Sequence, residues 1–436
     1  MYAKTWKTTV LALTAVGVLA AGCAEDDGGS GGGGGETAAG SPTAQSADPA
    51  SQEVDLAALD TGTWPTEPAP RFGSATKDDI TKIDGQRMAE FVVAPYEIDP
   101  VLTSPQSGPR VVESPRRMVD YLSGDAVKIL MDESYLYGFM SPAKEPQPNL
   151  RQADRSLING AWRFPDPETA KRAATLLHEK ALSGTGGEPA TAVDPATMPG
   201  TGPHMAGALV SRGKGSSMYG DPVATQSFTP HGDYVLYQWA EAPRGQEAWT
   251  AETVSKAVAA QGPWIDRFPQ TPTKSQTGGA KPTFPVIDQD KLLIYAVPTP
   301  PGDDPGGDDK AVYGPRGMAH RSSGPAMVEK ALTDTGSEHN AVARTTVHRT
   351  GDDAGAQTLL DTLTRADAGD GCTPSPAPKG LPTARCLAKD DEDGHHETCY
   401  VVQGRYVGHA EGTDKREVDQ LTSAQYVILT KADQRA

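Results

Sequence analysis

Apolar residues recur with the spacing of an amphipathic helix in two places along the chain. Each helical pattern follows a short stretch with the composition of a strand, at 161–164 in the first case and at 345–348 in the second. Asp166 precedes the first helix and Asp352 or Asp353 precedes the second, and aspartate is a preferred residue at helix N-termini. Both places therefore predict a strand followed by a capped helix. The apolar positions of the helices are Ala170, Ala173, Ala174 and Leu177, and then Ala356, Leu359, Leu360 and Leu363.

Further patterns match between the same two regions and in the same order. The paired ranges are 220–224 with 380–384, 234–237 with 399–402, 248–260 with 414–424, and 137–140 with 313–318. This shared order predicts an internal duplication, with related halves at about 75–270 and 285–432. The alternative is an α/β chain in which unrelated strand–turn–helix patterns recur. We predict the α+β class, two sheet-plus-helix halves with helices on one face of each sheet, and a ferredoxin-like arrangement as one candidate.

The N-terminus has the pattern of a targeting segment. Lys4 and Lys7 are followed by an apolar, uncharged run at 8–21, which is too short for a comfortable transmembrane helix and long enough for a signal peptide. The run ends in Leu-Ala-Ala-Gly before Cys23, and this resembles the bacterial lipobox. We predict that residues 1–22 are removed and that Cys23 is lipidated. An ordinary secretory signal with an incidental cysteine is the alternative.

A tether is predicted between this cysteine and the folded body. Residues 23–52 are rich in Gly, Ser, Thr, Ala and Pro, and such a segment buries too little apolar area to fold. The remaining boundaries are an N-terminal domain at 53–270, a Pro-, Gly- and Thr-rich linker at 271–284 and a C-terminal domain at 285–436. The predicted location is the outer face of the cell membrane, where the protein is held by its lipid.

The most apolar stretch of the body lies at 91–94 and is predicted to be a central strand. Arg87, Glu90 and Glu97 lie near its ends, where charged side chains could serve a site at the rim of the sheet. A solvated strand end is the plainer interpretation of the same three residues.

The net charge of the chain limits which partners it can bind. The net charge is −17, and removal of the signal makes it more negative because that segment contains two lysines and no acid. Such a chain is a poor partner for nucleic acid or for anionic headgroups. We expect no nucleic acid partner, and we interpret the acidity as solubility rather than as an acidic binding surface.

Three cysteines remain besides Cys23, all in the last quarter of the chain. Cys386 and Cys399 flank an acidic turn between two apolar runs, which places the two thiols opposite each other on a hairpin. We predict a Cys386–Cys399 disulfide, with Cys372–Cys386 as the alternative. A zinc site that uses both thiols with His395 and His396 is a rival, but the spacing departs from that of structural zinc sites. We therefore predict no metal.

Four segments carry a resemblance to a known family. They are Leu59-Asp60-Thr61-Gly62-Thr63-Trp64-Pro65-Thr66, residues 85–95, Tyr313-Gly314-Pro315-Arg316-Gly317 and Ala384-Arg385-Cys386. They are similar to a family of actinobacterial lipoproteins, of the mycobacterial and nocardial type, whose body is a domain of unknown function in two parts. The resemblance implies the lipoprotein placement and the two-part fold. It implies no ligand and no catalytic residue.

Catalytic motifs are missing from the sequence. There is no Gly-x-Ser-x-Gly elbow and no His-Glu-x-x-His pattern, and the glycine-rich stretch at 207–215 has the wrong spacing for a phosphate loop. We predict no catalytic residue and no cofactor. The expected function is a non-enzymatic, lipid-anchored envelope protein that binds an envelope component, a small ligand or a protein. An extracytoplasmic hydrolase without a linear motif and a sensor or assembly partner of a membrane complex are the alternatives.

Overall fold

The computed structural model describes residues 54–105, 110–146, 154–184, 188–217, 220–302, 310–391 and 394–435. The predicted signal segment 1–22, Cys23 and the predicted tether 23–52 lie outside the described residues. Within the described part of the chain, no helix is long and apolar enough to cross a membrane.

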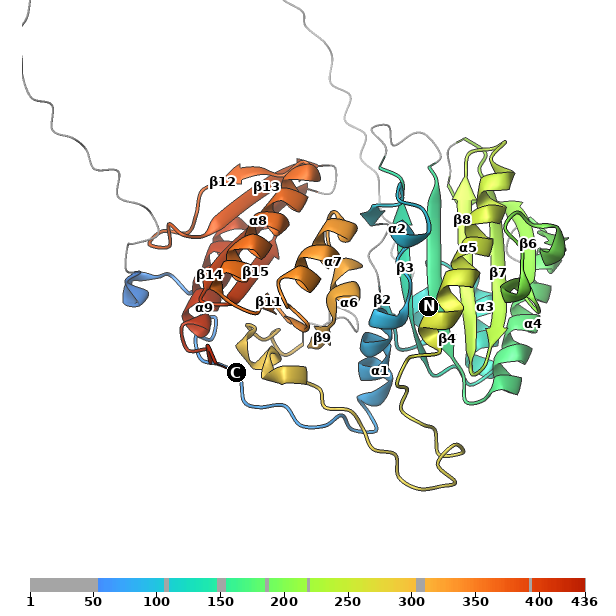
Figure 1. The fold of residues 1–436 in the computed structure, drawn as a ribbon, viewed down its shortest axis with the longest axis horizontal. Coiled ribbons are helices and arrows are strands. Elements are labelled where there is room, and N and C mark those ends of the chain that lie inside the picture. The colour runs from blue at the N-terminus through green and yellow to red at the C-terminus, as the bar shows by residue number, and fades with distance from the viewer. Residues whose placement is uncertain are drawn as a thin grey trace, which may run out of the picture. The chain divides into compact units, whose positions relative to one another are not determined.

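In the first half, the described strands form one antiparallel sheet of eight strands in the order β1-β3-β4-β8-β7-β6-β5, with β2 also paired to β3 (Figure 1). The strands are β1 (Ser104–Pro105), β2 (Arg110–Val112), β3 (Tyr137–Lys144), β4 (Ser156–Arg163), β5 (Thr191–Val193), β6 (Leu209–Lys214), β7 (Val223–His231) and β8 (Tyr234–Ala242). The helices are α1 (Ile80–Met88), α2 (Pro95–Ile98), α3 (Gly124–Asp132), α4 (Pro167–Ser183) and α5 (Glu247–Ile265).

In the second half, the described strands form an antiparallel sheet of seven strands in the order β12-β13-β14-β15-β11-β10-β9. The strands are β9 (Ala311–Tyr313), β10 (Asn340–Val342), β11 (Thr346–Arg349), β12 (Thr373–Ser375), β13 (Arg385–Asp391), β14 (Gly394–Gln403) and β15 (Tyr406–Gly412). The helices are α6 (Pro315–Ala319), α7 (Pro325–Asp334), α8 (Asp353–Gly369) and α9 (Lys415–Leu429).

The two halves share one topology, which confirms the predicted pair of related sheet-plus-helix halves. Along the chain, β2-α3-β3-β4-α4-β5-β6-β7-β8-α5 repeats as β9-α7-β10-β11-α8-β12-β13-β14-β15-α9. The strand order across each sheet repeats as well, so β4, β8 and β7 correspond to β11, β15 and β14. The capped helices are also equivalent, because Asp166 accepts a hydrogen bond from Thr169 N and Asp352 accepts one from Gly355 N.

Three of the sequence matches paired the wrong elements. The range 220–224 runs into β7, whereas 380–384 runs into β13, whose counterpart is β6. The strand at 234–237 is β8, whose counterpart is β15, whereas 399–402 lies in β14. The true match is Gly232-Asp233-Tyr234-Val235 with Gly404-Arg405-Tyr406-Val407, where each glycine has a positive φ in the turn before the strand. Similarly, 313–318 matches 113–118 and not 137–140, because Ser-Pro-Arg-Arg-Met follows β2 as Gly-Pro-Arg-Gly-Met follows β9.

Helices cover both faces of each sheet, and not one face as the sequence suggested. In β4, Trp162 packs against α4 while Leu157 packs against α5, since alternate residues of a strand point to opposite faces. In β14, Tyr400 packs in the cluster of α8 while Val401 packs in the cluster of α9. Each sheet is also larger than the four strands of a ferredoxin-like β-α-β-β-α-β unit.

The described chain begins with a segment that packs on the second half. Leu59 lies in the same buried cluster as Leu421 of α9. Ala69 N donates a hydrogen bond to Ile294 O, and the Lys431 ammonium donates one to Thr66 O. Residues 54–72 therefore form a strap over the second half, although the chain continues from them into the first. The boundaries 53–270, 271–284 and 285–436 stay predictions.

The apolar stretch at 91–94 is not the central strand that its composition predicted. A 3-10 helix, η3, covers Ala89–Phe91, and α2 begins at Pro95. Val92, Val93 and Ala94 are nonetheless buried. Gln261 of α5 satisfies the backbone here, because its side chain accepts a hydrogen bond from Val93 N and donates one to Phe91 O. The stretch is apolar because it is buried between elements, not because it belongs to a sheet.

Candidate functional site

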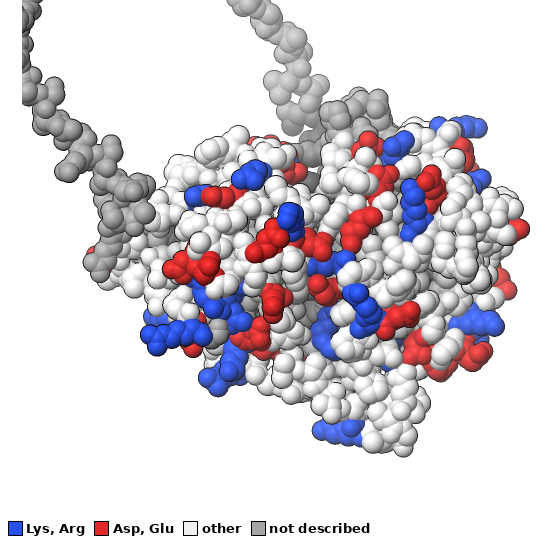
Figure 2. All heavy atoms as spheres, viewed as in Figure 1, with Lys and Arg blue, Asp and Glu red and all other residues white. Residues whose placement is uncertain are grey.

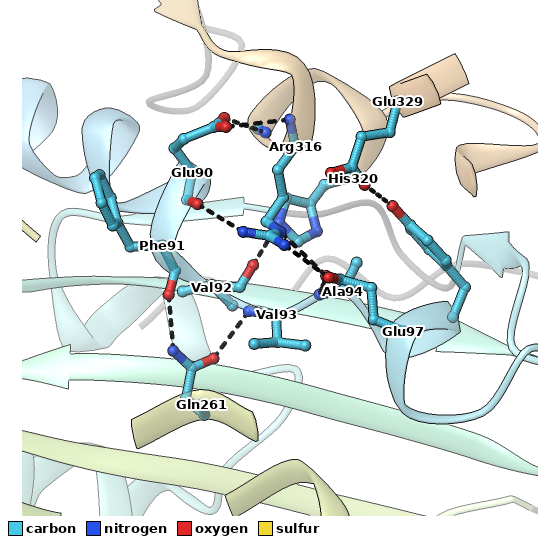
Figure 3. Close-up of polar contacts among 12 residues, drawn as sticks. Glu90, Phe91, Val92, Val93, Ala94, Glu97, Gln261, Arg316, His320 and Glu329 are labelled. Carbon is cyan, nitrogen blue, oxygen red and sulfur yellow. Dashed lines mark hydrogen bonds and ion pairs between the residues drawn. The ribbon is translucent and has the colours of Figure 1, made fainter. Parts of the chain in front are cut away.

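Arg316 of α6 reaches into the first half and fixes the junction between the halves (Figure 3). Its guanidinium donates two hydrogen bonds to Glu97, at 2.7 and 3.1 Å. The Glu90 carboxylate accepts a hydrogen bond from Gly317 N at 2.8 Å, and burial raises the pKa of this carboxyl. Arg316 also stacks on the ring of Trp264, 3.4 Å from the ring centroid. Charged residues at both ends of 91–94 thus hold the two halves together.

His320, at the end of α6, is a neutral side chain buried in the same junction. Its Nε2 lies 3.1 Å from both Ala89 O and Val92 O, so Nε2 carries the proton and donates to these carbonyls. Nδ1 therefore accepts a hydrogen bond from the Ser141 hydroxyl at 2.7 Å. Burial lowers the pKa of His320 to about 4.

Ser141 and His320 resemble a nucleophile and its base, but their surroundings do not suit hydrolysis. Backbone carbonyls, and not a carboxylate of any described residue, orient the imidazole. The space beside the pair is about 20 Å3, room for a water molecule and not for a substrate. The pair acts as a structural contact between β3 and α6.

A large cavity lies in the second half, on the sheet face that α8 covers. It has a volume of about 930 Å3, within the range of small-molecule sites. Met318 of α6, residues 321–323, Val328 of α7 and the last turns of α8 form one wall. Strands β10, β11, β14 and β15 form the other. The α6 helix thus links the two sites, with Arg316 in the junction and Met318 at the cavity.

A row of polar side chains crosses the sheet floor of this cavity. Thr346, His409 and Tyr400 lie directly opposite one another on β11, β15 and β14. The rings of Tyr400 and His409 stack at 4.5 Å, and the Tyr400 hydroxyl donates a hydrogen bond of 2.6 Å to Asp367. Burial raises the pKa of Asp367. Cys372, a free cysteine, also lines the cavity.

His348 presents a fixed hydrogen-bond acceptor to the cavity. Asn340 Nδ2 donates to two backbone carbonyls, those of Tyr313 and Ser337, which leaves Asn340 Oδ1 as an acceptor. His348 Nδ1 lies 2.7 Å from this oxygen and must therefore carry the proton. Burial lowers the pKa of His348 to about 3, so the ring is neutral. No described residue forms a hydrogen bond with its Nε2, and His348 lines the cavity, so this nitrogen is available as an acceptor to a ligand there.

The equivalent place in the first half is filled with aromatic side chains. Trp162 corresponds to His348, because each lies at the same distance before the capping aspartate of the next helix. Tyr237 corresponds to His409, and Phe228 to Tyr400. The Trp162 and Tyr237 rings stack at 4.5 Å in a buried cluster. In the second half, two smaller imidazoles, His348 and His409, and the phenol of Tyr400 stand in their place.

The helical wall of the cavity, opposite the sheet, also has polar residues where the first half has an apolar one. The match of 113–118 with 313–318 continues into Tyr121-Leu122-Ser123-Gly124 and Arg321-Ser322-Ser323-Gly324. Leu122 is buried in the aromatic cluster of the first half, whereas Arg321 and Ser322 line the cavity. The cavity therefore occupies a position that one copy of the fold fills and the other leaves open.

The disulfide lies on the opposite face of the same sheet. Cys386 and Cys399 are paired residues of β13 and β14, and the structure joins them as the hairpin pattern predicts. Cys372 is the free thiol, so the Cys372–Cys386 alternative is wrong. The zinc alternative loses both of its thiolate ligands to this bond.

The residues of the cavity were missed by sequence reasoning. His348 lay in a predicted strand, but it was not brought together with His409 or with Tyr400. The signal that could have found them is the Gly-x-Tyr-Val match, which aligns β8 with β15 and so sets Tyr237 against His409.

The surface charges on the face drawn in Figure 2 do not indicate a second binding site. Figure 2 shows acidic and basic side chains interspersed there, not gathered into one patch of a single sign. Several of the exposed charges form pairs along or between helices, such as Lys330 with Asp334. The cavity remains the candidate site.

Comparison with protein families places this fold. A model described as Domain of unknown function (DUF7373) N-terminal matches residues 72–280, and one described as DUF7373 C-terminal matches residues 292–432. The chain belongs to the DUF7373 family. The resemblance to a two-part domain of unknown function is thereby confirmed. In DUF7373 terms, the cavity and the disulfide lie in the C-terminal part, and the strap lies ahead of the matched N-terminal part.

No curated protein matches this DUF7373 chain. Among solved structures, the chain is similar to the extracellular domain of PknH from Mycobacterium tuberculosis, at 12% identity and a TM-score of 0.27. That match covers 44% of this chain and 98% of the PknH domain.

Proposed function

We propose that this protein is a non-enzymatic, lipid-anchored envelope lipoprotein that binds a small ligand in the cavity of its C-terminal half. The observation that carries the proposal is the difference between the two copies of the fold. Aromatic residues such as Trp162 fill the first copy, whereas the second is open and lined by His348 and His409. An open, polar-lined cavity costs stability, because buried side chains lose packing partners around it. A ligand would offset that cost.

The proposed location, at the outer face of the membrane, rests on two features. The lipobox-like sequence before Cys23 supports lipidation at the outer face of the membrane. The Cys386–Cys399 disulfide supports an oxidising, extracytoplasmic compartment. A single acyl chain binds membranes only marginally, whereas several chains on one cysteine would give a stable anchor.

Binding is favoured over hydrolysis by the geometry of the described residues. A hydrolase needs a nucleophile, a base and an orienting group around a space that holds substrate. Ser141 and His320 lack the space. In the cavity, burial lowers the pKa of His348 to about 3, far below the value that suits a general base near neutral pH.

The proposed lipid anchor and membrane location are tested by measuring the intact mass of the native protein and by membrane fractionation beside a Cys23→Ala variant. We expect a lipidated mass that begins at Cys23, and release from the membrane on substitution. A soluble, unlipidated wild-type protein contradicts the proposed anchor.

Ligand binding is tested by native mass spectrometry of the full chain purified from its own membranes. We expect a small molecule bound to the wild-type protein and absent from a Ser322→Leu/His348→Trp variant, which carries the residues of the first half at the cavity. Equal occupancy of both proteins, or none in either, contradicts a ligand site in this cavity. Integral membrane proteins that co-purify with the chain would instead favour the sensor or assembly role.

A further inference from the structure

Three charged side chains that line the cavity have partners within the protein, and a fourth, Glu411, is mostly exposed to water. Asp367 accepts the Tyr400 hydroxyl hydrogen bond, and Arg344 donates to Glu417 at 2.8 Å. Arg321 lies over the ring of Tyr313, 5.9 Å from the centroid. A charged ligand group buried here would need an uncommitted charge of opposite sign to offset its desolvation. The walls therefore favour a ligand without net charge.

One uncommitted polar atom at the cavity is an acceptor. His348 Nε2 offers a lone pair, since Asn340 holds the proton on Nδ1. A ligand that fills the cavity must donate a hydrogen bond to this nitrogen, because an unpaired buried acceptor costs free energy. Neutral groups that donate include hydroxyl and amide N–H groups.

The remaining lining joins hydroxyl groups to an apolar wall. Hydroxyls both donate and accept, so even those with a protein partner can bind a second group. They belong to Thr299, Ser322, Ser323, Thr346, Thr398 and Thr413. Met318, Val328, Val342 and Leu363 form the apolar surface. A ring with hydroxyls at its edge and C–H groups on its face matches both.

We propose that the ligand is a neutral, polyhydroxylated molecule, a sugar or polyol, which donates a hydroxyl hydrogen bond to His348 Nε2. This inference rests on the proposed ligand-binding function and names the chemical class of its ligand. Asn340 is a positioning residue in this site, because it selects the tautomer that makes His348 an acceptor.

The test is titration of the full, detergent-solubilised chain by saturation-transfer NMR and calorimetry. The neutral probes are glucose, trehalose and myo-inositol. The contrasting probes are glucose 6-phosphate, glucosamine and octanoate. We expect saturable binding of at least one neutral probe and weaker binding of the charged ones. His348→Phe should weaken the neutral probe about 10-fold, the effect of one lost hydrogen bond, while His231→Gln on the surface of the first half should not.

Two results overturn the inference and separate it from the proposed function. Saturable binding of octanoate or of a charged probe, with no neutral probe bound, keeps the ligand site and refutes the ligand class. Binding of no probe, together with an empty wild-type cavity in native mass spectrometry, refutes both.

A spectroscopic measurement on the wild-type chain tests the same hydrogen bond without a substitution that can disturb folding. Nitrogen NMR of the wild-type chain should show His348 protonated on Nδ1 and unprotonated on Nε2, and the bound neutral probe should shift the Nε2 signal. An Nε2-protonated tautomer, or a bound probe that leaves this signal unmoved, contradicts the proposed hydrogen bond.

Discussion

Trp162 and His348 occupy the same position in the two halves of the molecule, on equivalent strands before equivalent helix caps. Trp162 is fully buried against Tyr237, and His348 is buried at the edge of a cavity. One position in one fold thus serves packing in the first copy and an open site in the second.

Exchange of these two residues should have unequal effects on stability. Trp162→His removes a large buried ring from a packed cluster, and we expect a loss of about 3 kcal/mol in the free energy of unfolding. His348→Trp adds volume where space exists, so we expect a change of about 1 kcal/mol or less, set by the lost bond to Asn340. Urea denaturation of both variants measures the difference. Equal losses would show that the two positions are packed alike.

His320 should make stability fall as the pH falls below neutrality. Its pKa is about 4 in the folded state and about 6.5 unfolded, so between these values the unfolded chain binds more protons. Stability therefore rises with pH in this window, by about 1.4 kcal/mol per pH unit from this residue, and the effect vanishes above it.

The measurement is urea denaturation of the wild-type chain and His320→Gln at pH 7.5 and pH 5. The variant should lose less stability than the wild type between these values. The raised pKa values of Glu90 and Asp367 act in the opposite direction, but they contribute to both proteins and cancel in the comparison. Parallel pH profiles would mean that His320 is protonated in the folded state.

Arg316 and Arg116 are equivalent residues in the two copies of the Pro-Arg-x-Met segment, and they offer a matched pair of substitutions. Arg316→Ala leaves Glu97 without its guanidinium partner, and we expect a loss of about 3 kcal/mol in the free energy of unfolding. Arg116 is exposed, so Arg116→Ala should change it by less than about 0.5 kcal/mol. Arg316→Lys should also destabilise, because an ammonium cannot bond Glu97 in two places and stack on Trp264. Similar values for Arg316→Ala and Arg116→Ala would argue against the junction network.

Loss of the disulfide should destabilise the C-terminal half. The bond closes a short loop with a sequence separation of 13 residues, which corresponds to about 3 kcal/mol of chain entropy. We expect a loss of this size in a Cys386→Ala/Cys399→Ala variant and almost none in Cys372→Ala. Thermal unfolding of the two variants beside the wild type decides. If Cys372→Ala is the more damaging change, then Cys372 is the disulfide partner in the native protein.

Sequence patterns predicted those features that depend on local spacing. The helix positions Ala170, Ala173, Ala174 and Leu177 are buried as their period indicated, and Asp166 and Asp352 are the caps. The hairpin that holds Cys386 and Cys399 also follows from a local turn. The duplication was found, but its alignment slipped by one strand because glycine and proline turns look alike at that spacing.

The cavity depends on contacts between distant segments, which no local period reveals. His348, His409 and Arg321 come from three separate elements, and each is unremarkable in its own stretch of sequence. The prediction of a central strand at 91–94 was wrong because it, too, depended on contacts with a distant segment. Burial alone makes a segment apolar, and the Gln261 side chain can satisfy its backbone as a neighbouring strand would.

The strap at 54–72 has a consequence for how this chain folds and comes apart. Asp60 accepts a hydrogen bond from Gln420, and Lys431 binds Thr66 and Glu67, so the start of the folded body is tied to its last helix. The second half cannot complete its surface from its own residues, and contacts between the two ends of the body give the topology a high contact order. A protease cut in 271–284 should therefore leave two fragments that stay associated and melt together, as one cooperative unit that has been nicked rather than divided.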